Sequence, residues 1–291
     1  MIDLIELNGK KTEYYINGNS DKTILIFPGM EGNIYDWLDI AEEISKNFTV
    51  ILIHRQGVGK SEFINESEGV LTACRQAYSL LEKLNIKNKI ILLGHSYGGL
   101  CVQYFAKLYP EKIESAILVE STSIYVRELD KNNVFLKDNK EWLNLCKKYY
   151  NSTKDELRKE LNPNLSNKQL LLPKYIQTEL LDFYIRPELY KEEYLEILDL
   201  DNVTKFNDLS AFPDITLKIL VRDATYSINE MIKEEGLNES EANYIENIWQ
   251  TASKKLLSLS TKSSMELIEN CGHLINEDNP DAIINAIYSL V

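Results

Sequence analysis

The segment Lys89-Ile90-Ile91-Leu92-Leu93-Gly94-His95-Ser96-Tyr97-Gly98-Gly99 decides the fold of this chain. Its run of isoleucine and leucine is typical of a buried strand, and residues 97–109 carry the apolar spacing of a helix. Ser96 therefore stands on a tight turn between strand and helix, and the small glycines on both sides let the two elements pass closely. A serine in this G-x-S-x-G context is predicted to hold its hydroxyl above the edge of a sheet, where it can act as a nucleophile.

Outward from this segment, short apolar runs alternate with longer amphipathic stretches. Strands are predicted at residues 23–27, 49–53, 89–93, 115–119, 217–221 and 265–268, with a hairpin at 2–7 and 11–16 around Asn8-Gly9. Helices are predicted at residues 36–46, 69–84, 97–109 and 280–290. Such alternation predicts an α/β fold with a mostly parallel sheet flanked by helices.

The alternation stops after Ser123. Residues 124–212 carry a charged, aromatic-rich helical pattern, and strands resume only beyond them. We therefore predict a helical cap inserted at 124–212, on a core made of residues 1–123 and 213–291. Aromatic side chains of the cap are candidates for a pocket lining, although apolar residues at helical spacing more often pack helices together.

Composition and net charge limit the classes of partner that this chain is expected to bind. The chain has 291 residues, 44% of them hydrophobic, and a formal net charge of −13. This charge disfavours nucleic acid and anionic membranes as partners. Acidic residues stand where a signal peptide needs basic ones, and no apolar run reaches membrane-spanning length, so we expect a cytoplasmic protein. Four dispersed cysteines without a CxxC pair predict reduced thiols and no metal site. We expect no cofactor, and the sequence leaves the oligomeric state open.

A serine hydroxyl needs a neighbouring base, and the chain contains three histidines. His95 directly precedes Ser96, so its side chain is expected to point away from the serine hydroxyl. His54 ends a predicted strand, where a scaffold hydrogen bond is expected. His273 follows the last predicted strand, and a loop there can reach back over the sheet. His273 is therefore the predicted general base.

With these residues in place, the chain resembles the α/β-hydrolase superfamily over nearly its whole length. The matching pieces are Phe27-Pro28-Gly29-Met30-Glu31-Gly32, the turn at residues 55–61, the G-x-S-x-G turn and Gly272-His273. The resemblance implies an α/β-hydrolase fold and an oxyanion hole formed by the backbone N–H groups of Met30 and Tyr97. In the family the first piece usually reads His-Gly. Here Pro28 replaces the histidine, which alters the loop but leaves a backbone oxyanion hole possible.

The resemblance offers two positions for the acid that orients the histidine. The family's commonest position lies just after the strand at 217–221, where Asp223 is the nearby carboxylate. Members resembling haloalkane dehalogenases place the acid at the end of the strand after the nucleophile helix, where Glu120 stands. We favour Glu120, because a strand-end residue is better fixed for orienting an imidazole, and keep Asp223 as the alternative.

Together these features predict a carboxylesterase-like serine hydrolase that acts on a small ester or related acyl substrate through an acyl-enzyme. One alternative is an aminopeptidase acting on N-terminal proline, in which cap carboxylates hold the substrate ammonium; the candidates are Glu179, Asp182, Glu188, Glu192 and Glu193. A second alternative is a weakly catalytic binding protein on the same scaffold. Dehalogenase and epoxide hydrolase chemistry is disfavoured, because it needs a carboxylate at the position of Ser96.

Overall fold

A computed structural model describes residues 2–64, 67–200 and 206–290, and its framework is an eight-stranded sheet. The strands follow the order β1-β2-β4-β3-β5-β6-β7-β8 across the sheet. They are β1 (Ile2–Leu7), β2 (Lys10–Asn17), β3 (Thr23–Phe27), β4 (Thr49–Ile53), β5 (Ile90–His95), β6 (Ile113–Val119), β7 (Thr216–Arg222) and β8 (Ser263–Ile268). Strands β3 to β8 pair in parallel, and the β1–β2 hairpin joins β4 in antiparallel fashion. The predicted α/β fold with its mostly parallel sheet is confirmed.

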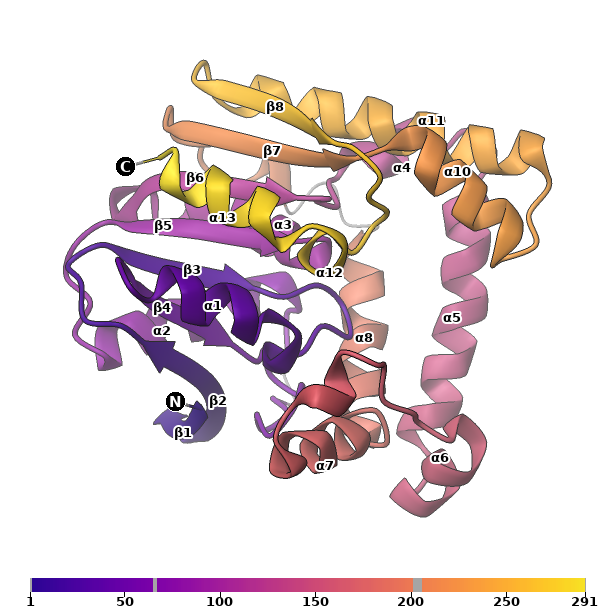
Figure 1. The fold of residues 1–291 in the computed structure, drawn as a ribbon, viewed down its shortest axis with the longest axis horizontal. Helices are drawn as coiled ribbons and strands as arrows, with labels where there is room; N and C mark the ends of the chain where they lie inside the picture. The colour runs from indigo at the N-terminus through magenta and orange to yellow at the C-terminus, as the bar shows by residue number, and fades with distance from the viewer. Residues whose placement is uncertain (1, 65–66, 201–205, 291) are drawn as a thin grey trace.

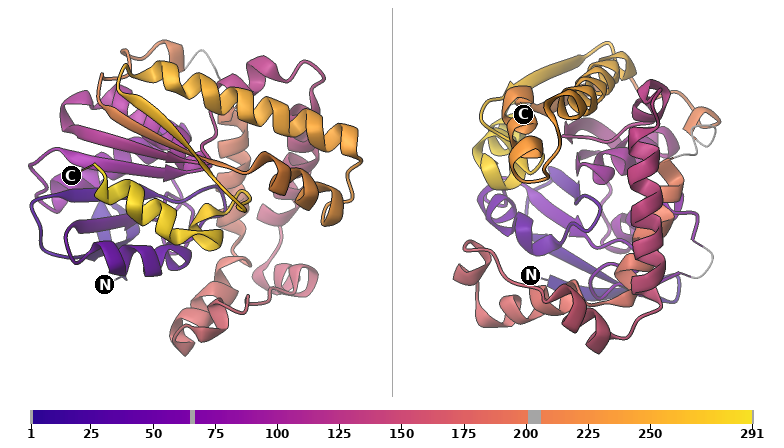
Figure 2. Two further views of the ribbon diagram at one scale, coloured as in Figure 1. Left: turned by 45° about the horizontal axis from the view of Figure 1, so that its top comes forward. Right: turned by 90° about the vertical axis from the view of Figure 1, so that its right-hand side faces the viewer.

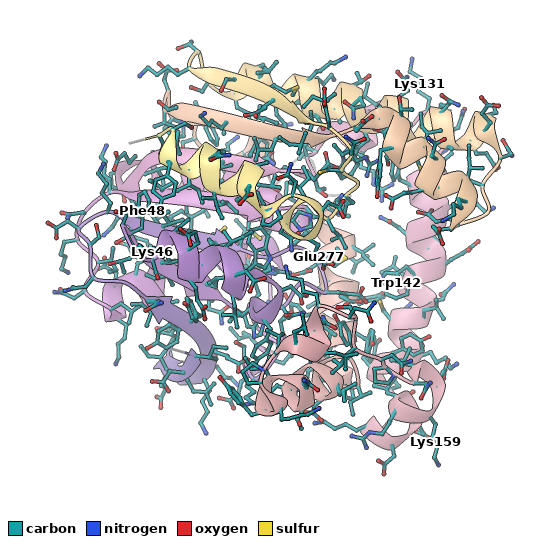
Figure 3. All side chains as sticks on the ribbon, viewed as in Figure 1. Lys46, Phe48, Lys131, Trp142, Lys159 and Glu277 are labelled. Carbon is teal, nitrogen blue, oxygen red and sulfur yellow. The ribbon has the colours of Figure 1, made fainter. Side chains whose placement is uncertain are left out.

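Helices cover both faces of this sheet (Figure 1). On one face lie α1 (Leu38–Ile44) and α13 (Pro280–Tyr288), over a core that includes Phe48, which Figure 3 labels. On the other face lie α2 (Val70–Lys83) and α3 (Tyr97–Leu108). Because both faces are covered, β3 and β4 are buried along their whole length, which explains their continuous apolar sequences.

The chain between β6 and β7 forms helices beyond the carboxyl ends of the strands (Figure 1). They are α4 (Tyr125–Leu129), α5 (Val134–Tyr150), α6 (Lys154–Leu161), α7 (Lys174–Phe183) and α8 (Pro187–Leu200). All of them fall within the stretch 124–212 that the sequence assigned to a cap, and we call them the cap helices. Residues 201–205 of that stretch lie outside the described residues.

Two further helices, α10 (Ala224–Lys233) and α11 (Glu239–Lys255), lie between β7 and β8, and α12 (Ile275–Asp278) precedes α13. The sequence pattern assigned no element to residues 224–255. Figure 2 shows α11 running alongside the β7–β8 end of the sheet. Its apolar residues, among them Ile248 and Trp249, pack with Val126 of α4. Among the described residues there are also four short 3-10 segments, at Ile34–Trp37, Pro110–Lys112, Gln169–Leu171 and Leu256–Leu259.

The cap helices are joined to the strands by a buried arginine, Arg55, just after β4. Its Nε donates to Oε1 of Glu196 on α8 at 2.5 Å, and its Nη1 and Nη2 donate to the carbonyl oxygens of Pro28 and Gly29 at 2.7 and 2.8 Å. Around this link the cap helices have their own apolar core, against which Trp142 of α5 packs (Figure 3). The cap is therefore tied to the loop that follows β3.

In the described part of the chain, no helix combines the length and the apolar character needed to cross a membrane.

The cap core also encloses a carboxyl group, Glu193 of α8, which is 1% exposed. Burial, with the neighbouring carboxylates of Glu31 and Glu196 adding to it, raises the pKa of Glu193 well above its usual range. The Cys146 thiol lies 3.7 Å from Glu193 Oε2. Folding therefore leaves a proton on Glu193 at pH values where the unfolded chain has released it.

Replacing Glu193 with Gln is expected to remove a pH-dependent loss of stability. The pKa of Glu193 is higher in the folded state than in the unfolded state. Its contribution to folding stability is therefore complete below the unfolded-state pKa and declines as the pH rises toward the folded-state pKa. The wild type loses up to about 1.4 kcal/mol per pH unit in that window. Thermal melts of Glu193→Gln should exceed those of the wild type more at pH 8 than at pH 5. The exposed Glu188 on the same helix supplies the control Glu188→Gln; an equal difference at both pH values in the two variants would contradict the expectation.

Candidate active site

The turn between β5 and α3 has the geometry that the sequence implied. Ser96 has φ 52° and ψ −121°, a backbone conformation that residues other than glycine seldom adopt. Its N–H donates to the Val119 carbonyl at 3.1 Å, and its carbonyl accepts from the Thr122 N–H at 3.0 Å. A Cβ at Gly98 would stand 2.0 Å from the Phe27 carbonyl oxygen, so only glycine fits there. The half-buried serine is thus fixed by backbone contacts on both sides.

The two histidines that were expected to serve the scaffold do so. His54 Nε2 accepts from the Ile34 N–H at 2.8 Å, and its Nδ1 lies 2.7 Å from Glu13 Oε2. His95 Nε2 lies 2.8 Å from the carbonyl oxygen of His273. A carbonyl only accepts, so His95 carries its proton on Nε2. Burial and the neighbouring His273 lower the pKa of His95 to about 3, which keeps this ring neutral while it anchors the loop of His273.

Glu120 follows β6 and is fully buried. Its Oε2 lies 3.4 Å from Nδ1 of His273 and accepts a hydrogen bond from Nε1 of Trp249 at 2.9 Å. Its Oε1 accepts from the backbone N–H of Arg222 at 2.7 Å. The residue itself has φ 44°, a second strained position beside Ser96. Residues 96, 120 and 273, widely separated in sequence, are therefore brought to one end of the sheet.

Asp223 occupies a different role in the structure. Its Oδ1 accepts from the N–H groups of Thr225 and Tyr226 at 2.9 and 3.3 Å, which caps the start of α10, and its Oδ2 accepts from the Asn270 N–H at 3.3 Å. These backbone donors, Asn270 first, lower the pKa of Asp223. The carboxylate that faces His273 in the described structure is that of Glu120.

The loop after β3 lies against the serine. A Cβ at Gly29 would come within 3.2 Å of Ser96 Cβ, so Gly29, the residue before Met30, lies against the serine side chain. Tyr97 is the first residue of α3, where backbone N–H groups point out of the helix end. Arg55 holds the carbonyls of Pro28 and Gly29 on the far side of the loop. Gly29, which precedes Met30, and Tyr97 therefore both lie next to Ser96.

A cavity of about 430 Å³ opens at Ser96 and His273. Helix α10 contributes Glu230 and Met231 to its wall, and helix α11 contributes Ile245 and Trp249. A neighbouring cavity of about 560 Å³, between the start of α5 and the α10–α11 turn, shares Glu235 and Ile245 with it. The two cavities therefore adjoin, and much of their wall comes from residues 224–255, which the sequence left unassigned.

Three of the five cap carboxylates considered for an ammonium site pair with other side chains. Glu179 pairs with Lys60 at 2.7 Å, Asp182 pairs with Arg186 at 2.6 Å, and Glu192 accepts from Gln56 at 2.9 Å. None of the five candidates is among the described residues that line the cavity at Ser96. The carboxylates that do line it, Glu230 and Glu235, come from α10 and the turn after it, so a sequence interpretation confined to the cap could not find them.

Comparison with known proteins identifies the family to which this chain belongs. A family model described as alpha/beta hydrolase fold matches residues 22–175. The Bacillus subtilis protein named "Uncharacterized protein YbdG" is 26% identical over 119 residues, which cover 40% of this chain and 37% of that protein. The Arabidopsis thaliana protein named "Putative methylesterase 11, chloroplastic" is 32% identical over 91 residues, covering 31% of this chain and 23% of that protein. The chain thus spans well under half the length of both relatives.

Structural similarity extends further along the chain. A thermophilic esterase from Thermogutta terrifontis superposes with a TM-score of 0.67 and 17% sequence identity, over 99% of this chain and 96% of that one. At this identity the likeness establishes a shared fold.

Proposed function

Because this chain belongs to the α/β-hydrolase fold family, we propose that it is a serine hydrolase that cleaves a small ester or related acyl compound. The observation that carries the proposal is that Ser96 and His273 line one cavity while the buried Glu120 lies behind His273, with Nδ1 of His273 3.4 Å from Glu120 Oε2. A nucleophile, a base and a buried acid in this chain order form the constellation that activates a serine hydroxyl.

In the proposed reaction, Ser96 Oγ attacks the substrate carbonyl carbon while Nε2 of His273 takes the hydroxyl proton. Glu120 accepts the Nδ1–H of His273, which selects the tautomer and stabilises the imidazolium that forms. The N–H groups of Met30 and Tyr97 would bind the oxyanion. His273 then gives its proton to the leaving alcohol, and a water molecule releases the acyl group from Ser96 by the same steps in reverse.

The cavity wall supports a substrate that is neutral or cationic. Met231, Ile245 and Trp249 offer apolar surface, and the exposed Glu230 and Glu235 place negative charge at the cavity. Arg222 also lines it, but its guanidinium is paired with the buried Glu246. An anionic acyl group would meet these carboxylates and the overall charge of −13. The names of two similar proteins, an esterase and a methylesterase, support ester chemistry.

Ser96→Ala is expected to lose activity on the order of 10⁶-fold, because no other described group occupies the nucleophile's place. The measurement is hydrolysis of nitrophenyl esters of graded acyl length, together with covalent labelling by a fluorophosphonate probe. Labelling should be rapid in the wild type and absent in Ser96→Ala. A folded wild type that resists the probe would favour the alternative of a binding protein on a hydrolase scaffold.

Glu120→Gln is expected to lower kcat by roughly 10⁴-fold, because a neutral amide no longer favours the imidazolium or the correct tautomer. Asp223→Asn is the matched comparison: it makes the same change from carboxylate to amide, and asparagine still caps a helix. It should cost little activity. A large loss of kcat in Asp223→Asn, together with a near-normal kcat in Glu120→Gln, would instead make Asp223 the acid that orients His273.

An aminopeptidase remains the second candidate, and the observation in its favour is that Glu230 and Glu235 line the cavity, where they could pair with a substrate ammonium. We expect neutral esters to be hydrolysed at least tenfold faster than proline p-nitroanilide, because both carboxylates are exposed and exposed ion pairs contribute about 0.2–1 kcal/mol. The kcat/KM values of the two substrates decide it. Preference for the proline amide, lost in the variant Glu230→Gln/Glu235→Gln, would establish the aminopeptidase instead.

A further inference from the structure

The environment of Glu120 contains a cation that the proposed mechanism does not use. Three donors approach Oε2 of Glu120: Trp249 Nε1 at 2.9 Å, His273 Nδ1 at 3.4 Å and Nη1 of Arg222 at 3.5 Å. The arginine is nearly buried and its guanidinium also lies over the Trp249 ring, 5.1 Å from the centroid. Arg222 is therefore close enough to act on the charge of Glu120.

Most of this guanidinium is committed to another carboxylate, that of Glu246 on α11. Its Nε and Nη2 donate to Glu246 Oε2 at 3.0 and 2.6 Å, much shorter than the 3.5 Å to Glu120. Glu246 is 2% exposed, and its other oxygen accepts from Gln250 at 2.7 Å. The side chain of Gln250 also donates to the Arg222 carbonyl at 3.2 Å. Helix α11 thus holds the arginine from its far side.

The division of hydrogen bonds has a direct electrostatic consequence. A cation that paired closely with Glu120 would compete with the imidazolium of His273 for the same oxygen and would cancel the negative charge that stabilises it. With Glu246 present, the two neighbouring charges of Arg222 and Glu246 largely compensate each other in a buried site. Glu120 then keeps its charge for His273.

We propose that Glu246 is a positioning residue: by holding Arg222 against α11, it keeps the guanidinium from neutralising Glu120, so that Glu120 remains available to His273. The inference rests on the proposed function of Ser96, His273 and Glu120. It assigns a task to a residue that does not itself line the cavity but pairs with Arg222, a residue that does.

Other titratable groups surround His273, and they are the same in every variant below. His95 from β5 is neutral, as its low pKa shows. Asp278 from α12 accepts the Gly272 N–H at 2.8 Å, and Glu230 from α10 lies against Gly272. Asp223 caps α10, and burial raises the pKa of the Cys271 thiol. A difference between wild type and a variant at residue 246 therefore reports on the Arg222–Glu246 pair.

The test is the pH dependence of fluorophosphonate labelling, a reaction in which Ser96 Oγ bonds to phosphorus, fluoride leaves and His273 takes the serine proton. Glu246→Gln keeps the shape of the side chain but removes its charge. The rate constant for labelling is expected to fall about tenfold at neutral pH. The acid limb of the profile, the low-pH region in which the rate rises as His273 loses its proton, should move down by about one pH unit. Both changes are expected because the uncompensated cation disfavours the imidazolium. A folded Glu246→Gln protein whose acid limb does not move overturns the proposal.

Two further variants distinguish the effect of the Glu246 charge from a structural effect of the substitution. Glu239→Gln makes the same substitution at the exposed first residue of α11, and its profile should match the wild type. Arg222→Met/Glu246→Gln removes both charges, so its acid limb should lie at or above the wild-type position even if its rate is lower. An acid limb below that of the wild type in the double variant would overturn the proposal, and this variant decides the matter if Glu246→Gln alone does not fold.

Failure of the inference and failure of the proposed function give different results. If Ser96 is not the nucleophile, labelling is absent in the wild type or persists in Ser96→Ala. If the function holds but Glu246 has only a structural role, Glu246→Gln lowers thermal stability and labelling amplitude while the acid limb stays in place.

Discussion

The site depends on the close passage of β5, α3 and the loop after β3 around Ser96. With a Cβ at Gly98 only 2.0 Å from the Phe27 carbonyl oxygen, the helix could not start where it does if that residue had a side chain. The same turn is bonded to the end of β6, through Ser96 N–H to Val119 O and Thr122 N–H to Ser96 O. One packing constraint therefore sets the serine, the loop with Met30 and the residue that follows β6.

Burial of charge is the second constraint, and the molecule meets it in two ways. Glu120, fully buried, receives hydrogen bonds from the Arg222 backbone and Trp249 and lies beside His273. Glu193, equally buried, stands beside other carboxylates and its pKa rises instead. Glu120 thus has hydrogen-bond donors around its oxygens, whereas desolvation and like charges favour the neutral form of Glu193. The first environment suits a residue that must stabilise an imidazolium, whereas the second suits only a neutral carboxyl group.

The sequence predicted the features that are formed by contiguous residues. The strands and the G-x-S-x-G turn are contiguous, so apolar runs and glycines identified them. The sequence could not choose firmly between Glu120 and Asp223, because the choice depends on which side chain faces His273 after folding. Arg222 and Glu246 were missed for a similar reason, since their pairing joins β7 to α11 over 24 residues. A signal existed: Glu246, Trp249 and Gln250 recur at helical spacing, with two polar residues on a face that carries a tryptophan.

The position of Glu120 also explains the architecture of the cavity. With a carboxylate after β6 facing His273, the turn after β7 need not supply one. Asp223 can then cap α10, using its side chain on Thr225 and Tyr226. This N-terminal capping by Asp223 lets α10 begin directly after β7 and extend beside the serine, where Glu230 and Met231 form part of the cavity wall. Helix α11 returns along the sheet and brings Trp249 and Glu246 to the far side of Glu120. Helix α11 therefore both shapes the cavity and holds the acid, so changes in α11 that alter substrate fit will also alter the charge around His273.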